Sequence, residues 1–145
     1  MSVDRSYIAQ NQAQRARLRA LVERLGDEQL ARPMVGGWTI AAALAHLAFW
    51  DRRAVVLLEK WEREGYEPTT ADADVLNEAL LAEWLAIPAR EAARLALSAA
   101  EAVDRKLETV GPELIAAIAA VNARWIVRAA HRGEHLDDIE RALAG

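Results

Sequence analysis

Helix-forming residues dominate this chain from end to end, and helix-breaking residues occur at only a few places. Alanine is abundant and the β-branched residues are scattered, so strand patterns are nearly absent. The seven glycines and four prolines punctuate the chain rather than fill any stretch of it. The sequence therefore predicts an all-α protein whose helix ends are marked by glycine, proline and capping residues.

The first half of the chain predicts two long helices. The first covers residues 4–25, with Asp4 capping its N-terminus and Gly26 closing its C-terminus. The second begins at the N-cap Thr39 and runs to residue 64, where Gly65 stops it. The loop between the two helices is long for a minimal bundle turn, which suggests that it covers something.

A third helical region is predicted over residues 72–110, but it contains Pro88. Proline disturbs the interior of a helix, because it lacks an N–H group and its ring clashes with the preceding turn. We therefore expect a short helix that ends at about Leu85 and a longer one that starts at Pro88.

The last helix is predicted to begin at either Pro112 or Asn122 and to end at Leu143. With it the chain has four long amphipathic helices, which favours a four-helix bundle with a broken third helical region. A length of 145 residues predicts that this bundle is a single domain spanning residues 1–145.

Composition excludes several classes of function. A net charge of −4 argues against binding to nucleic acid, because phosphate binding needs a clustered positive surface. Zero cysteine excludes disulfides, thiolate metal sites and a cysteine nucleophile. No signal peptide or apolar run of membrane-spanning length is recognisable, so we expect a cytoplasmic protein that binds no membrane.

The three histidines of the chain occupy positions from which they can meet. His131 and His135 are four residues apart, which places them on one face of a helix. His46 lies midway along another predicted helix, among apolar residues. A lone histidine in such a position is more often a hydrogen-bonded core residue. If the two helices pack together, however, the three imidazoles supply the ligands of an open catalytic metal site.

Two carboxylates accompany the histidine pair. Asp138 falls on the same face of the helix as the two histidines. It is interpreted as a fourth ligand, as an acceptor that orients an imidazole, or as a surface residue. Glu134 completes an H-x-x-E-H pattern, in which the glutamate of an inverted zinc protease is the general base. Only ten residues follow His135, which leaves little room for the downstream third ligand of such a protease.

A di-iron site of the ferritin type is excluded, because it needs a glutamate three residues before each of two histidines. The three corresponding positions hold Ala43, Arg128 and Arg132.

The segments Gly37-Trp38-Thr39, Ala45-His46-Leu47-Ala48 and Trp50-Asp51 resemble the second-helix motif of the DinB-like superfamily. This superfamily includes the N-terminal domains of mycothiol-dependent maleylpyruvate isomerases and the bacillithiol transferases. The segment from His131 to Leu136 resembles the H-x-x-x-H of its fourth helix, and Asn77 also suits the pattern. The resemblance covers nearly the whole length of the chain.

The resemblance implies a bundle with an up-down-down-up order of helices. It also implies a divalent metal, zinc or nickel among others, held by His46, His131 and His135 together with water. Characterised members resemble thiol S-transferases or isomerases that use mycothiol, bacillithiol or glutathione. We therefore expect a small-molecule substrate and a metal-dependent thiol transferase.

The chemistry of such a site leaves alternatives open. A metal-bound thiol loses its proton and attacks an electrophilic carbon, whereas metal-bound water would make the protein a hydrolase. Glu134 and Asp138 are the candidates to assist proton transfer. Candidates to contact the thiol cofactor are Trp50, Arg124 and Arg128. Non-catalytic alternatives are a stress-related metal- or ligand-binding module and a structural helical dimerisation domain. Whichever of these functions applies, we also expect a homodimer formed through helix faces.

Trp38 and Asp51 are interpreted as residues that fix the geometry of the loop and the helix. Phe49 is interpreted as part of the bundle core.

Overall fold

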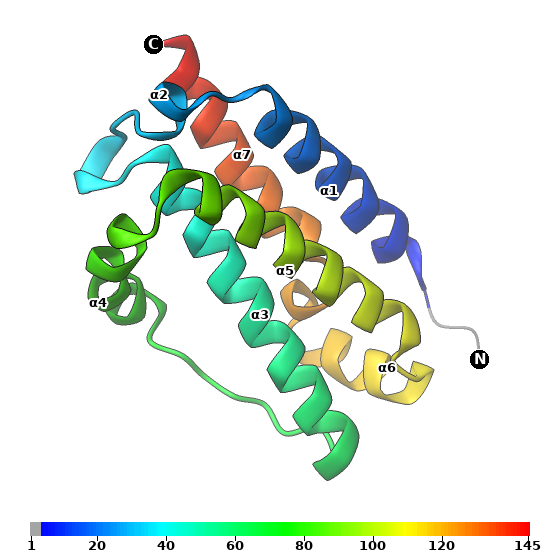
Figure 1. Cartoon of the computed structure of the whole chain (residues 1–145). Coiled ribbons are helices and arrows are strands. Elements are labelled where there is room, and N and C mark those ends of the chain that lie inside the picture. The colour runs from blue at the N-terminus through cyan, green and yellow to red at the C-terminus, as the bar shows by residue number, and fades with distance from the viewer. Residues whose placement is uncertain (1–3) are drawn as a thin grey trace.

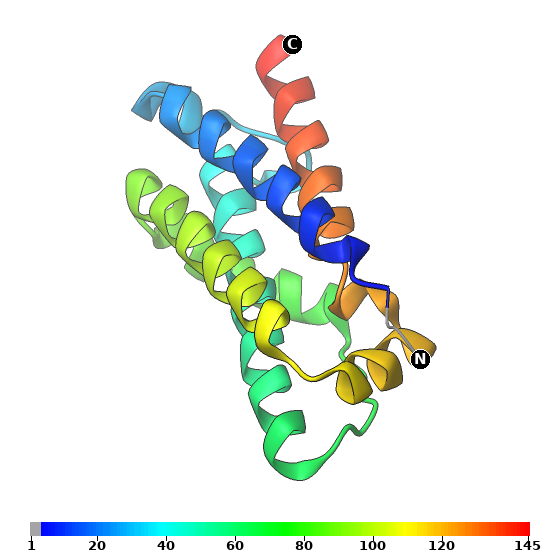
Figure 2. The same cartoon turned by 90° about the vertical axis from the view of Figure 1, so that its right-hand side faces the viewer.

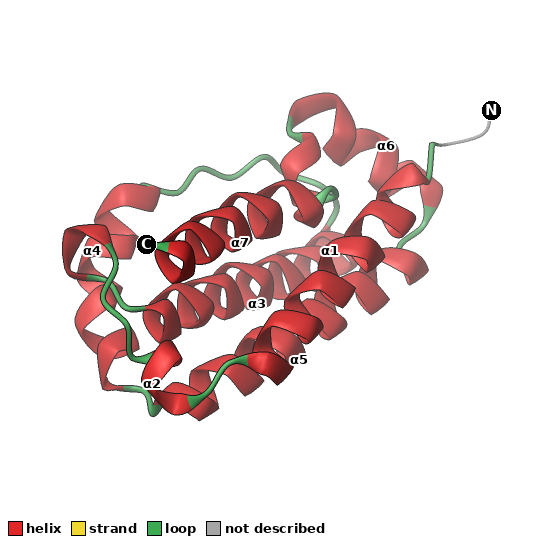
Figure 3. Ribbon diagram, turned by 90° about the horizontal axis from the view of Figure 1, so that it is seen from above, coloured by secondary structure: helices red, strands yellow, loops and turns green. Residues whose placement is uncertain are grey.

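The computed structural model describes residues 4–145, and all the regular elements in this range are helical (Figure 3). Four long helices form a bundle: α1 (Ser6–Arg24), α3 (Ile40–Glu64), α5 (Ala89–Thr109) and α7 (Arg128–Ala144). Between them lie α2 (Asp27–Leu30), α4 (Ala73–Ala86), α6 (Pro112–Val121) and two 3₁₀ turns, η1 (Val35–Gly37) and η2 (Ala123–Trp125). The prediction of an all-α bundle is confirmed.

The four long helices follow the up-down-down-up order. In Figure 1, α1 and α7 run toward the top of the molecule, whereas α3 and α5 both run toward the bottom. Around the bundle, α3 packs against α5 and α7, and α1 packs against the same two helices. Because α3 and α5 are parallel neighbours, the chain must return along the bundle between them. The segment after Gly65 and helix α4 make this return (Figure 1).

Local capping signals predict several helix ends correctly. The hydroxyl oxygen of Thr39 accepts a hydrogen bond from the Ala42 N–H at 3.0 Å, which caps α3. Gly65 ends α3 with a φ of +91°, a conformation that glycine adopts without strain. Pro88 separates α4 from α5, and the Asp4 carboxylate accepts from the first N–H of α1, on Ser6, at 2.9 Å.

Two predicted helix ends are wrong. Gly26 does not close α1, since it has a φ of −86° and is the N-cap of the short helix α2. The last bundle helix starts at neither Pro112 nor Asn122 but at Arg128. Pro112 opens the separate helix α6, which ends because Asn122 has an extended backbone (φ −154°, ψ 97°) and begins η2. Figure 2 shows α6 at the lower end of the bundle, below α7.

The core consists of two apolar clusters. One surrounds the upper halves of α3 and α5, where buried alanines let the helices approach closely, and the other lies toward the lower end around Leu58, Leu107 and Ile118. Buried polar side chains lie at the level between the clusters: Asn11, His46, Asp51, Asp104, Arg128 and Arg132. The candidate site is built on this polar layer.

None of the helices in the described part of the chain combines the length and apolarity needed to cross a membrane.

Candidate metal centre

The three histidines of the chain meet inside the bundle. His46 projects from the middle of α3, and His131 and His135 project from successive turns of α7. The Nε2 atom of His46 lies 3.1 Å from Nε2 of His131 and 3.0 Å from Nε2 of His135. The structure therefore brings together the three residues that the sequence singled out, through the packing of α7 on α3.

This arrangement fits a tetrahedral metal ion. Among the described residues the three histidines form a group whose potential ligand atoms all lie within 4.8 Å of one another. Two nitrogens bound at 2.0–2.1 Å to a tetrahedral ion are separated by roughly 3.3 Å. The observed separations are close to this value, so the nitrogens are nearly in position before an ion is added.

The surroundings keep the imidazoles neutral, which is the form that binds metal. Burial, followed by the nearby His135, lowers the pKa of His46 from 6.5 to about 3. Burial and the guanidinium of Arg128 lower the pKa of His131 to about 2. Burial also lowers the pKa of His135, although the Asp138 carboxylate opposes that shift.

Neutral imidazoles have an acceptor lone pair on one ring nitrogen and a proton on the other. The Nδ1 atoms of His46 and His131 are buried without a hydrogen-bond partner in the described structure. With the proton on Nδ1, the lone pair of each ring lies on Nε2, at the point where the three rings meet. A cation at this point would relieve the repulsion between the lone pairs.

Aromatic rings enclose His46. Trp38, which precedes α3, and Trp84 on α4 pack edge-on against its imidazole, with ring centroids 5.4 and 5.2 Å away. The ring of Trp50 lies farther away, with its centroid 6.5 Å from that of His46. Phe49, which was expected in the core, is half-buried and contacts Trp50 and Trp84. No local sequence pattern marks Trp84, because its role depends on how α4 packs on α3.

A cavity of about 400 Å³ opens beside the histidines, and we call it the polar cavity because most of its lining residues are polar. His46 and His131 form part of its wall, and all three predicted cofactor contacts, Trp50, Arg124 and Arg128, line it as well. Asn77 on α4 also lines the cavity, and its side-chain oxygen accepts a hydrogen bond of 2.8 Å from the Trp50 indole. The segment that returns from α3 to α5 thus forms part of the cavity wall.

Two arginines line this cavity, and each of them is paired with a carboxylate. Arg124 is exposed and forms an ion pair with Glu134 at 3.2 Å. Arg128 is buried, and its guanidinium lies 5.7 Å from the centre of the Trp125 ring. Arg53 stacks on the rings of both Trp125 and Trp50. An anionic group in the cavity would therefore compete with Glu134 for the exposed Arg124.

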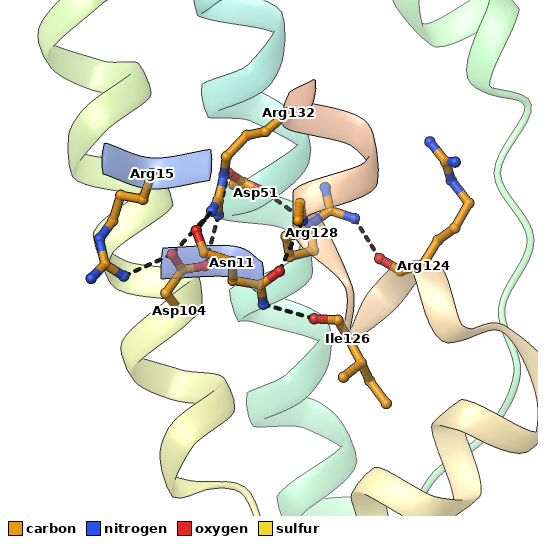
Figure 4. Close-up of polar contacts among 9 residues, drawn as sticks. Asn11, Arg15, Asp51, Asp104, Arg124, Ile126, Arg128 and Arg132 are labelled. Carbon is orange, nitrogen blue, oxygen red and sulfur yellow. Dashed lines mark hydrogen bonds and ion pairs between the residues drawn. The ribbon is translucent and has the colours of Figure 1, made fainter. Parts of the chain in front are cut away.

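A network of buried ion pairs centres on Arg132, the residue that follows His131 in α7 (Figure 4). The guanidinium of Arg132, which is fully buried, binds Asp104 on α5 at 2.8 Å and Asp51 on α3 at 3.2 Å. Arg128 also binds Asp51, at 2.8 Å, and Arg15 on α1 binds Asp104, also at 2.8 Å. These contacts connect all four long helices.

Asn11 extends the network to the start of α7. Its amide nitrogen donates to the carbonyl of Ile126, and its amide oxygen accepts from the N–H of Ala129, at 2.9 and 2.8 Å. The backbone carbonyl of Asn11 accepts from Arg132. The expected role of Asp51 in fixing helix geometry is thus visible, whereas Asn11, Asp104 and Arg132 were missed. Their only sequence signal is the presence of polar residues on otherwise apolar helix faces.

The two carboxylates near the histidine pair lie outside the three-histidine group. Glu134 is exposed and binds Arg124, and Asp138 is exposed and contacts Arg141. Asp138 nevertheless faces the same open pocket as His135. Asp138 thus supplies a negative charge near His135, consistent with its effect on the pKa of that residue.

The comparisons with known proteins agree with the resemblance found in the sequence. The family model of the DinB superfamily matches residues 10–144. Comparison with curated proteins and with solved structures gave no significant match.

Proposed function

The chain belongs to the DinB superfamily, and on this premise we propose that it is a metal-dependent thiol S-transferase or isomerase. Zinc or nickel would be held by His46, His131 and His135. The observation that carries the proposal is the convergence of three neutral imidazole nitrogens at one point next to an open cavity. Three histidine ligands are the protein ligands of an open zinc site, which leaves a position for a substrate.

A divalent ion held there supplies a positive charge that lowers the pKa of a bound thiol. The polar cavity then determines which thiol binds. Arg124 and Arg128 favour an anionic cofactor such as mycothiol, bacillithiol or glutathione, and Trp50 offers an apolar wall beside them. Glu134 and Asp138 are the candidates to take up the proton released by the thiol.

In the proposed transfer, the thiol sulfur forms a bond to an electrophilic carbon of the second substrate. The leaving group of that carbon departs with the bonding electron pair. The enclosure of His46 by Trp38 and Trp84 keeps water away from this part of the site. Exclusion of water strengthens the electrostatic interactions within the site.

Elemental analysis of the untagged protein tests the proposal, beside a variant that combines His131→Ala and His135→Ala. We expect about one divalent ion per chain in the native protein and none in the variant. The metal-loaded protein should then conjugate a low-molecular-weight thiol with an electrophile. Protein that takes up no zinc or nickel would contradict the proposal.

The same experiment separates the alternatives. Metal bound without turnover of any thiol and electrophile would support a non-catalytic, stress-related binding module. Metal-dependent hydrolysis without a thiol requirement would support a hydrolase.

A further inference from the structure

A second pocket reaches the three-histidine group at His135, which does not line the polar cavity. It has a volume of about 810 Å³ and lies between the segment 33–38, the start of α3 and the second half of α7. Its apolar walls include Met34, Val35, Trp38, Ala43 and Ala142, and His135 faces it. The size is in the range of pockets that hold small molecules.

The lining of this apolar pocket differs from that of the polar cavity. Its charged lining residues are Asp138 and Arg141, and these two side chains contact each other as an ion pair. They leave no net charge for a ligand to neutralise. Arg124 and Arg128 in the polar cavity are likewise paired, with Glu134 and Asp51, but its lining also includes hydrogen-bonding side chains that the apolar pocket lacks: Thr69, Thr70, Asn77 and Asn122. The two pockets therefore favour ligands of different chemistry.

Hydrogen bonds hold the outer wall of the apolar pocket in place. The Met34 N–H donates to the carbonyl of Trp38 at 2.7 Å, and the Ile40 N–H donates to the carbonyl of Arg32 at 3.1 Å. The Arg32 guanidinium donates to the carbonyl of Leu143 at the end of α7, at 3.1 Å. The pocket is thus formed before any ligand arrives.

The tip of this wall presents an apolar side chain to solvent. Val35 is 95% exposed at the rim of the pocket. It is followed by Gly36 and Gly37, whose φ angles of 80° and 83° allow the tight turn. An apolar ligand in the pocket would cover part of the Val35 side chain and remove apolar surface from water.

We propose that this pocket binds an uncharged, apolar small molecule, which would be the electrophilic co-substrate of the thiol reaction. Binding to the pocket follows from its lining and charge, whereas the role as co-substrate rests on the proposed function. The thiol would approach from the polar cavity, past His46 and His131, and the apolar partner from the side of His135.

Titration with N-phenyl-1-naphthylamine, an uncharged dye that fluoresces in apolar surroundings, tests the proposal. We expect saturable binding to the native protein. Val35→Asp places a charge at the rim and should raise the dissociation constant about tenfold, since losing the burial of part of a valine is worth roughly 1.4 kcal/mol. Ala142→Phe fills the pocket and should abolish binding.

The matched control is Val56→Asp, which changes an exposed valine on α3 outside the pocket. It should alter the dissociation constant less than twofold. Absence of saturable binding, or equal binding by native protein, Val35→Asp and Ala142→Phe, would overturn the proposal. Equally tight binding of anionic naphthalene-1-sulfonate would also overturn it, because the pocket would then not select an uncharged ligand.

A His131→Ala variant separates this inference from the proposed function. His131 is a proposed metal ligand but does not line the apolar pocket. We expect this variant to lose metal and to bind the dye with unchanged affinity. Dye binding in a protein that never takes up metal would leave the pocket established and the thiol-transfer function refuted. Metal uptake without dye binding would refute only the pocket.

Discussion

The guanidinium of Arg132 is the most deeply buried charge in the described structure, and it is shared by two carboxylates from different helices. Burying these charged groups costs desolvation free energy, but breaking one of the ion pairs costs more free energy. Removal of one partner leaves a buried charge without compensation. Asp51 would retain only Arg128, and Asp104 would retain only the partly exposed Arg15.

We predict that Arg132→Met lowers the free energy of unfolding by about 3–5 kcal/mol. Denaturation in urea, followed by circular dichroism, measures this change. The control is Arg94→Met, which removes an exposed ion pair with Glu91 and should leave the free energy of unfolding nearly unchanged. A similar, small loss in both variants would show that Asp51 and Asp104 need no buried partner.

The three histidines were predicted from the sequence, but the residues of the buried ion-pair network were not. His131 and His135 are linked by helical periodicity, which is a local property. Arg132, by contrast, has its two acceptors at positions 51 and 104, on helices whose packing no local pattern specifies. The same reason explains why Trp84 was not recognised as a neighbour of His46.

Helix α7 carries two of the three histidines, and it also contains a glycine in its interior. Gly133 has no unusual backbone angle. A Cβ atom added there would meet the nearest atom, Oε1 of Gln14, at 3.6 Å, which is ordinary van der Waals contact. Glycine in a helix interior costs stability relative to alanine, because it loses more conformational freedom on folding.

Gly133→Ala should therefore raise the free energy of unfolding by about 0.5–1 kcal/mol. Gly65→Ala provides the contrast, because Gly65 has a φ of +91° and alanine there should cost roughly 1–2 kcal/mol. Chemical denaturation of the two variants beside the native protein gives both values. Destabilisation by Gly133→Ala would mean that α7 and α1 are packed too closely for an added methyl group.

The helices themselves were largely predictable from the sequence, and the failures have local causes. Thr39, Gly65 and Pro88 act through their own backbone or side chain, so their effects can be read from the sequence. Gly26 was misread because the residues after it form a further short helix. The start of α7 was misread because the backbone of Asn122 interrupts a pattern that otherwise looks continuous.

Burial keeps the histidines neutral in the folded protein, and this makes the free energy of unfolding depend on pH. In the unfolded chain each histidine returns to a pKa near 6.5. In the folded, metal-free protein the pKa of His46 is about 3 and that of His131 is about 2. Between these values and 6.5 the unfolded state binds protons that the folded state does not bind.

We predict that metal-free protein in the presence of a chelator loses unfolding free energy as the pH falls from 6.5 toward 4. The slope contributed by each histidine is at most about 1.4 kcal/mol per pH unit. Above pH 7 this contribution is fully present and constant. Urea denaturation at several pH values measures it.

The double variant His131→Ala, His135→Ala should show a shallower slope over the same pH range. An unfolding free energy of native protein that does not change between pH 7 and pH 5 would contradict the burial of neutral histidines.

The order of the bundle helices was predictable only through the family resemblance. Periodicity indicates four long helices, but it does not say which of them are neighbours. The parallel packing of α3 and α5 depends on the return through α4, whose length alone does not reveal its path. The apolar pocket likewise arises from segments near residues 35, 43 and 142, which only the assembled fold brings together.

The buried ion pairs also determine which alternative alignments of α7 are accessible during folding. Histidines and arginines repeat on α7 at the same four-residue interval, so a slip by one turn, about 5.4 Å, would place His135 where His131 belongs and Arg132 where Arg128 belongs. The misaligned helix would then offer Leu136 to Asp51 and Asp104. A leucine cannot pair with two buried carboxylates, so the slipped alignment is strongly disfavoured. The buried ion pairs therefore select against a fold in which only one histidine of α7 occupies a metal-ligand position.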